Sequence, residues 1–144
     1  SPKAVDTRMK IGKVQLERGR FEDALEAYSH ALYMKAGLFG DSHPSVAKIH
    51  EAISIVHCEK DQPTEAVKDM KRALRVYREE YGDENLTVIS TVESIGVLYL
   101  IIGNFEKAAC IFAEAVKLKM STLGKTNPDV AKSLIKWGST HEKI

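Results

Sequence analysis

The sequence predicts an all-α fold in which one helical hairpin occurs three times and is followed by a single helix. The segments GDSHPSV, GDENLTV and GKTNPDV begin at residues 40, 82 and 124, so one pattern recurs every 42 residues. Small residues recur at the same interval, as at Ala24, Ala66 and Ala108. A fixed period of this size is typical of repeat proteins, whose units bury their apolar faces by stacking on neighbours.

The helices of one hairpin are clearest in the third repeat. From about residue 87 to 102, apolar residues are spaced by three or four, which predicts one buried stripe of a helix. Gly103-Asn104 predicts the end of that helix, and a second apolar stripe follows from 105 to about 123. We therefore expect one domain over 1–144, with repeats at about 2–43, 44–85 and 86–127 and a capping helix at about 128–142.

The GDSHPSV-type segments are predicted to be the junctions between hairpins. Asn127-Pro128 places a good N-cap residue before a proline, which is tolerated at the first position of a helix. The same point in the earlier repeats holds His43-Pro44 and Asn85-Leu86. Each of these pairs therefore predicts the start of a first helix.

When the three repeats are aligned, some equivalent positions, or columns, hold small residues and others hold large ones. This alternation predicts close helix contacts inside each hairpin. Helices approach closely where one presents a small residue and the other inserts a bulky one. The predicted small positions are Gly12, Ser54 and Gly96, and the predicted insertions are Tyr28, Met70 and Phe112. Filling a small position should overpack the contact and cost about 1–3 kcal/mol or more.

The last helix repeats the pattern of a first helix. Its stacking stripe is predicted to contain Val130, Leu134, Trp137 and Gly138. Ile135 and Ile144 lie off that stripe, and we expect them to be exposed. Terminal repeats normally present polar outer faces, so this end suits either a piece of a larger protein or a surface that self-associates.

Composition narrows the class of function. The net charge of +1, from 21 basic and 20 acidic residues, gives no global field that favours nucleic acid or an anionic membrane. No apolar run is long enough to cross a bilayer. Cys58 and Cys110 stand in unlike contexts, which suits a reducing compartment and predicts a cytoplasmic protein. Phosphate-binding loops, nucleophile motifs and metalloprotease motifs are absent, so the sequence predicts neither an enzyme nor a cofactor.

The third repeat reads Val92-x-x-Ile95-Gly96-x-x-Tyr99, followed by Ala108-x-x-x-Phe112. This resembles the signature of tetratricopeptide repeats. The period of 42 and the segments FGDSHPSVA and LGKTNPDVA are similar to the repeats of kinesin light chains. The resemblance implies a right-handed α-solenoid and a non-enzymatic scaffold, whose first helices line a concave groove for a peptide or helix of a partner protein. The paired Asn residues that kinesin light chains carry on this face are replaced here, by Glu93-Ser94 for example.

The residues expected to face such a groove lie off the packing stripe of each first helix. The predicted binding residues are Lys48, Glu51, Ile55 and Cys58 in the second repeat, and Ser90, Glu93, Ser94, Val97, Leu100 and Ile101 in the third. The first repeat contributes Asp6, Met9, Lys10, Lys13, Leu16 and Glu17, and the second adds Ala52 and Glu59. Val97, Leu100 and Ile101 are predicted to form an apolar strip with Ile55. The alternative is that Ile101 and Ile102 are buried against their own hairpin.

Particular residues of the sequence also suggest other functions. Self-assembly through the apolar groove or the last helix is the second interpretation. A third is binding of an anion or RNA by a basic stripe formed by Lys68, Lys71, Arg72, Arg75 and Arg78, although acidic residues interleave with it. His50, His57 and Cys58 lack the short paired spacing of zinc ligands, so no metal site is predicted and the histidines are expected to be packed.

Overall fold

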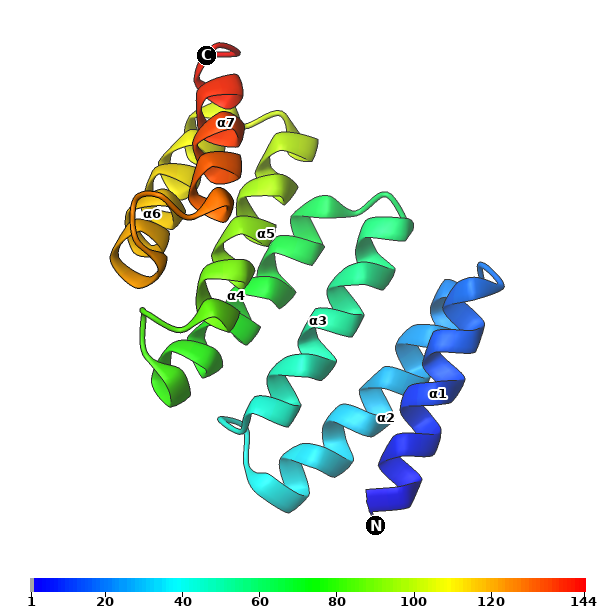
Figure 1. Cartoon of the computed structure of the whole chain (residues 1–144). Coiled ribbons are helices and arrows are strands. Elements are labelled where there is room, and N and C mark those ends of the chain that lie inside the picture. Colours follow the sequence, from blue (N-terminus) through cyan, green and yellow to red (C-terminus); the bar gives the residue numbers. More distant parts are fainter. Residues whose placement is uncertain (1) are drawn as a thin grey trace. The chain divides into compact units, whose positions relative to one another are not determined.

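The computed structural model describes residues 2–144, and within them the chain forms seven α-helices and no strand (Figure 1). The all-α fold is therefore confirmed. The helices are α1 (Pro2–Glu17), α2 (Phe21–Phe39), α3 (Pro44–Glu59), α4 (Pro63–Tyr81), α5 (Leu86–Ile102), α6 (Phe105–Leu123) and α7 (Pro128–His141). The chain divides into two compact units, one ending at Val76 and one spanning Tyr77–Ile144, and each is described by itself below.

The three junctions begin helices as predicted, because a side chain caps each one. Asn85 Oδ1 accepts a hydrogen bond from the Thr87 N–H at 2.8 Å, and Asn127 Oδ1 accepts one from the Asp129 N–H at 2.9 Å. At the first junction, His43 Nδ1 accepts a hydrogen bond from the Ser45 N–H at 3.1 Å. Each bond satisfies one of the backbone donors that a helix start leaves without a partner.

The predicted close contacts are present at both glycine positions. A Cβ added to Gly12 would lie 2.5 Å from Tyr28 Cε1, and one added to Gly96 would lie 2.6 Å from Phe112 Cε1. Real Cβ atoms do not come so close to a neighbour, so only glycine fits these aromatic rings. In the second repeat, Ser54 and Met70 are both buried.

The core repeats from hairpin to hairpin. Ala24, Ala66 and Ala108 are all 0% exposed, so the column that first indicated the repeat is equally buried in each hairpin. In the first unit, one cluster of buried side chains joins α1, α2 and α3. Its buried members are Val5, Ala24, Tyr28, Ala31, Ile49, Ile53 and Val56.

The stripe predicted for α7 is wrong in part. Val130 is buried and Trp137 is half-buried, but Leu134 is 37% exposed and Gly138 is also exposed. Ser133 and Thr140 are buried instead. Leu134 and Gly138 stand in the columns that face the second helix of the same hairpin, as Gly12 faces Tyr28, and no such helix follows α7 among the described residues. Ile135 and Ile144 are exposed, as predicted.

Candidate functional site

One side of α5 presents a line of exposed residues in the second unit. Ser90, Ser94, Val97 and Ile101 are spaced by three or four, which places them on one face of the helix. Val97 is 37% exposed and Ile101 is 58% exposed, while Leu100 at the edge of the line is half-buried. We call Ser90, Ser94, Val97, Leu100 and Ile101 the α5 face. Its C-terminal half is apolar and its N-terminal half carries hydroxyl groups.

The opposite side of α5 supplies the core. Val88, Val92, Ile95 and Tyr99 are buried there, so the helix is apolar on both sides at its C-terminal end. The alternative in which Ile101 and Ile102 are buried is wrong, because both side chains are exposed. The neighbouring helices cover only one side of α5. The apolar residues of α5 extend beyond that side, so some of them are exposed.

Leu86 also belongs to this line, and the sequence interpretation missed it. It lies four residues before Ser90, and its side chain is exposed. In the sequence, Leu86 stands out only as the residue after the Asn85 N-cap. Its spacing of four residues from Ser90 is the feature of the sequence that indicates its place on this line.

Glu93 has a different environment from the one expected of a groove residue. Its carboxylate lies 2.7 Å from Lys119 Nζ on α6 and accepts a hydrogen bond from Ser133 Oγ on α7 at 2.9 Å. Lys119 Nζ also donates to Ser133 Oγ, at 2.9 Å, and Lys136 Nζ lies 3.9 Å from the carboxylate. The side chains of Glu93 and Lys119 are largely buried, so this network joins three helices of the second unit.

In the first unit, the predicted residues of α3 divide by exposure. Lys48 and Ile55 are exposed, whereas Glu51 and Cys58 are half-buried. Burial, followed by the nearby carboxylate of Glu59, raises the pKa of the Cys58 thiol and so disfavours its thiolate form.

Three other residues predicted to face a groove lie against the core instead. Met9 and Leu16 of α1 and Ala52 of α3 are partly buried against the hydrophobic cluster of the first unit. They lie close to the boundary between the packed and exposed sides of their helices. Spacing alone places a residue on one side of a helix, but it does not fix where the packed side ends.

The two histidines of α3 are packed. His57 Nδ1 lies 2.6 Å from Asp69 Oδ2 of α4, and Arg72 Nη1 lies 3.0 Å from the other carboxylate oxygen. Burial lowers the pKa of His50, and the charge of Arg72 lowers it further. Across residues 2–144, no group of three His, Cys, Asp or Glu side chains is arranged to hold a metal ion.

Acidic partners engage much of the basic stripe of α4. Lys68 pairs with Glu65 at 3.3 Å, and Arg78 pairs with Glu114 at 2.6 Å. Arg72 is bound to Asp69, as described above. These ion pairs use basic groups that a nucleic-acid site would direct at phosphates.

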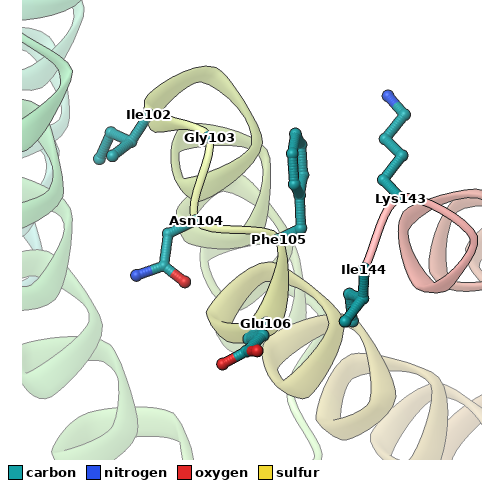
Figure 2. Close-up of a pocket in the computed structure, with 7 residues that line it drawn as sticks. All are labelled: Ile102, Gly103, Asn104, Phe105, Glu106, Lys143 and Ile144. Atoms are coloured by element: carbon teal, nitrogen blue, oxygen red, sulfur yellow. The ribbon is translucent and has the colours of Figure 1, made fainter.

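A hollow of about 430 Å³ lies at the turn between α5 and α6 (Figure 2). Its lining residues are Ile102, Gly103, Asn104, Phe105, Glu106, Lys143 and Ile144. Asn104 Oδ1 is occupied in capping α6, since it accepts a hydrogen bond from the Lys107 N–H at 3.2 Å, and Lys143 Nζ lies 5.8 Å from the centre of the Phe105 ring. The sequence did not predict this hollow, because folding alone brings the chain end to the turn.

The repeated hairpins and their exposed first-helix faces define a helical-repeat interaction module. A family model described as tetratricopeptide repeat matches residues 45–121, and the chain belongs to this family. The predicted resemblance to tetratricopeptide repeats is thus confirmed. Tetratricopeptide repeats are protein-interaction scaffolds that bind protein partners and are generally not enzymes.

Solved structures of the same fold include kinesin-light-chain-like proteins. BtubC (BKLC) from P. vanneervenii has a TM-score of 0.81 and 20% identity, over 96% of this chain and 56% of that protein. A structure of Podospora anserina kinesin-light-chain-type TPR-like repeats has a TM-score of 0.77 and 15% identity, over 99% and 68% of the two chains. The N-terminal domain of stress-induced protein-1 from C. elegans has a TM-score of 0.68 and 18% identity, over 94% and 95%.

The curated relatives are much longer proteins. Clustered mitochondria protein homolog from Coccidioides immitis is 22% identical over 121 residues, which cover 84% of this chain and 9% of the relative. The homolog from Emericella nidulans is also 22% identical, over 84% of this chain and 10% of its own length. No helix within residues 2–144 is both long and apolar enough to cross a membrane.

Proposed function

We propose that this chain is a non-enzymatic cytoplasmic scaffold that holds a peptide or helix of another protein against the exposed faces of its first helices. The α5 face is the central part of the proposed site in the second unit. Lys48, Glu51, Ile55 and Cys58 form the proposed contact surface of α3 in the first unit. The free thiols of Cys58 and Cys110 support the assignment to a reducing compartment.

The observation that carries this proposal is the exposure of Val97 and Ile101. Large aliphatic side chains aligned on one face, next to polar residues, are a common form of protein-binding surface. Ser94 Oγ donates to the Ser90 carbonyl at 3.0 Å, so the hydroxyl oxygen of Ser94 presents an acceptor to a bound chain. An apolar anchor on the ligand would contact Val97 and Ile101, and its polar backbone would lie beside the serines.

The test compares two neighbouring residues of the same type. Ile101→Glu places a charge on the α5 face, whereas Ile102→Glu places the same charge on another exposed side of α5. We expect both variants to fold, and only Ile101→Glu to lose the partners that the wild type captures from a cell extract. Leu100→Glu should show the same loss. Equal capture by all variants would contradict the proposal.

Self-assembly is the second candidate function, and α7 provides its support. Leu134 and Ile135 are exposed on this helix, and Ile144 is exposed after it. Sedimentation over a range of concentrations distinguishes the two functions. A monomer favours a separate ligand, whereas a dimer that dissociates in Ile135→Glu favours assembly through α7.

A further inference from the structure

A recess on the exposed side of α2 shares no residue with the surfaces proposed above. Its volume is about 580 Å³. It is lined by Tyr33, Met34, Ala36, Gly37, Leu38 and Asp41. The Tyr33 and Leu38 side chains are 83% and 51% exposed. We call these six residues the α2 recess, and we propose that it binds a segment of a partner protein that carries an arginine or lysine beside a large apolar side chain.

Gly37 lies at the centre of the α2 recess, because the other lining residues are one, three or four positions away from it in the sequence. Glycine weakens a helix compared with alanine. The Gly37 backbone is not in the left-handed conformation, and a Cβ added to it would meet no atom within 4 Å. Neither backbone geometry nor packing within the described residues therefore requires glycine here. Its effect is to leave the helix surface open between Tyr33 and Leu38.

The positions of Tyr33 and Gly37 are exposed in all three hairpins. Their equivalents are Arg75 and Glu79 in the second hairpin and Lys117 and Ser121 in the third. Each of these later hairpins follows another hairpin in the chain, so the exposure of these positions does not depend on what precedes a hairpin. This part of a second helix is therefore an outer surface of the repeat and not the contact surface for another hairpin.

The exposed side of the second helix changes its charge between the first two hairpins. Four basic positions of α4 have no lysine or arginine at the equivalent positions of α2. Lys68, Arg72, Arg75 and Arg78 of α4 correspond to Glu26, His30, Tyr33 and Ala36 of α2. Glu26 is exposed and lies seven residues before Tyr33, which places it on the same side of the helix. This side of α2 therefore presents a carboxylate and an aromatic ring where α4 presents cations.

Asp41 lacks the cation that its equivalent in the second hairpin has. Arg78 Nε lies 3.1 Å from Asp83 Oδ1, and the residues 42 positions before this pair are Ala36 and Asp41. Within residues 2–144, no lysine or arginine forms an ion pair with Asp41. Asp41 acts on His50, but burial, the largest effect, lowers the pKa of that histidine and disfavours its cationic form. The place that Arg78 fills in the second hairpin is thus open to a cation from a partner.

The apolar and acidic parts of the α2 recess are adjacent, and together they define the partner. A large apolar side chain would fill the space over Gly37, between Tyr33 and Leu38, while a neighbouring arginine or lysine would pair with Asp41. An arginine would also stack on the exposed Tyr33 ring. Charge complementarity favours a basic segment and suppresses an acidic one, and the carboxylates repel the phosphate groups of nucleic acid and anionic lipid.

The experiment uses a random peptide library displayed on phage, because such a library samples combinations of basic and apolar residues. Selection on the full wild-type chain is compared with selection on Ala36→Arg and on Gly37→Gln. Ala36→Arg supplies the cation that Asp41 lacks, and Gly37→Gln fills the recess without adding charge. We expect the peptides selected only on the wild type to carry Arg or Lys next to Leu, Met or an aromatic residue. Peptides that bind the α5 face would be selected on all three proteins.

A labelled peptide from the wild-type selection is then titrated into each protein, and binding is followed by fluorescence anisotropy. Both variants should weaken its binding by about tenfold or more. Ser121→Gln is the matched control, since it places the same side chain as Gly37→Gln at the equivalent position of the third hairpin, and binding should be unchanged. Ile101→Glu, which charges the α5 face, should also leave binding unchanged. Circular dichroism checks that each variant remains helical.

A charge exchange tests the contact with Asp41 directly. Asp41→Lys introduces the residue type that Lys125 provides at the equivalent position of the third hairpin. It should weaken binding of the selected peptide. A peptide whose basic residue is replaced by glutamate should bind Asp41→Lys more tightly than it binds the wild type. This reversal would support the pairing of Asp41 with a cation of the partner.

Three outcomes would overturn the inference. One is a selection that gives the same peptides on the wild type and on both variants. Another is a set of wild-type-specific peptides that lack basic residues. The third is a dimer of the wild-type chain that Gly37→Gln dissociates, since the α2 recess would then serve a second copy rather than a partner. None of these results depends on the α5 face, so the proposed function stands or falls separately.

Discussion

The second and third hairpins fill equivalent core columns with side chains of opposite polarity. Where the second hairpin has His57 and Asp69, the third has Tyr99 and Ile111. The polar pair is hydrogen-bonded at 2.6 Å inside the first unit, whereas Tyr99 is a buried aromatic residue of the second unit. The comparison shows that the repeat preserves which columns are packed, while the chemistry within a column changes when every polar group finds a partner.

The close contact between the two helices of a hairpin also differs between the second and third hairpins. Gly96 receives the Phe112 ring, but the equivalent residues of the second hairpin are Ser54 and Met70. The Ser54 hydroxyl donates to the Glu51 carbonyl of its own helix at 2.6 Å, so its polarity is satisfied locally. A flexible thioether tolerates a Cβ opposite it better than a flat ring does. The third hairpin therefore depends on the fit of the Phe112 ring against Gly96. The second hairpin depends on the hydrogen bond between His57 and Asp69.

The largest effect is expected from removing the ring of the third hairpin. Phe112→Ala should lower the free energy of unfolding by about 3–5 kcal/mol, because a buried aromatic side chain is lost and a cavity remains beside Gly96. Urea unfolding followed by circular dichroism measures the loss. In the Phe112→Ala background, Gly96→Ala should recover part of it by filling the space. A loss below about 1 kcal/mol would show that Phe112 does not anchor this hairpin.

The next effect tests the polar link of the second hairpin. Asp69→Asn keeps the shape of the side chain but removes the charge that holds His57 and Arg72, and we expect a loss of about 1–3 kcal/mol. Glu65→Gln is the matched control, since it removes the same charge one turn earlier from an exposed pair with Lys68. The control should change stability by less than about 1 kcal/mol. Equal effects of the two variants would contradict a special role for Asp69.

Much of this arrangement could be predicted from the sequence, since the repeat fixes relationships between columns. The spacing of 42 residues correctly indicated the three junctions, the buried alanine column and the pairing of Gly96 with Phe112. Each of these features involves residues that are close in the sequence, and the pattern that indicates it recurs every 42 residues. A pattern that recurs in several copies reflects a packing requirement and not chance.

The features that the sequence did not predict depend on which helix covers which side. Glu93 looked like a groove residue, because nothing in its spacing showed that Lys119 and Ser133 reach it from two other helices. Leu134 matches a column that is buried in the third hairpin, but it is exposed because no second helix follows α7 among the described residues. Ile11 has buried counterparts in both later repeats, yet it is exposed. The repeat shows which positions are equivalent. A side chain at such a position is buried only where a neighbouring helix covers it.

The smallest effect concerns the turns inside the same two hairpins. Gly103 ends α5 with φ of 90°, and Asp61 holds the equivalent position after α3 with φ of 62°. Side chains are disfavoured in this left-handed region, although aspartate tolerates it better than most residues. Gly103→Ala should therefore cost about 1 kcal/mol, whereas Asp61→Gly should change stability by less than about 0.5 kcal/mol, because the relief of strain is offset by the greater freedom of glycine in the unfolded chain.

Thermal unfolding of the two single variants and the wild type makes this comparison. Asp61→Ala completes the set, because it places the same methyl group at the turn of the second hairpin that Gly103→Ala places at the turn of the third. If the turns are equivalent, alanine should be disfavoured at both positions, and Asp61→Ala should be less stable than Asp61→Gly. A wild-type melting temperature in Gly103→Ala would mean that the left-handed turn of the third hairpin relaxes without cost.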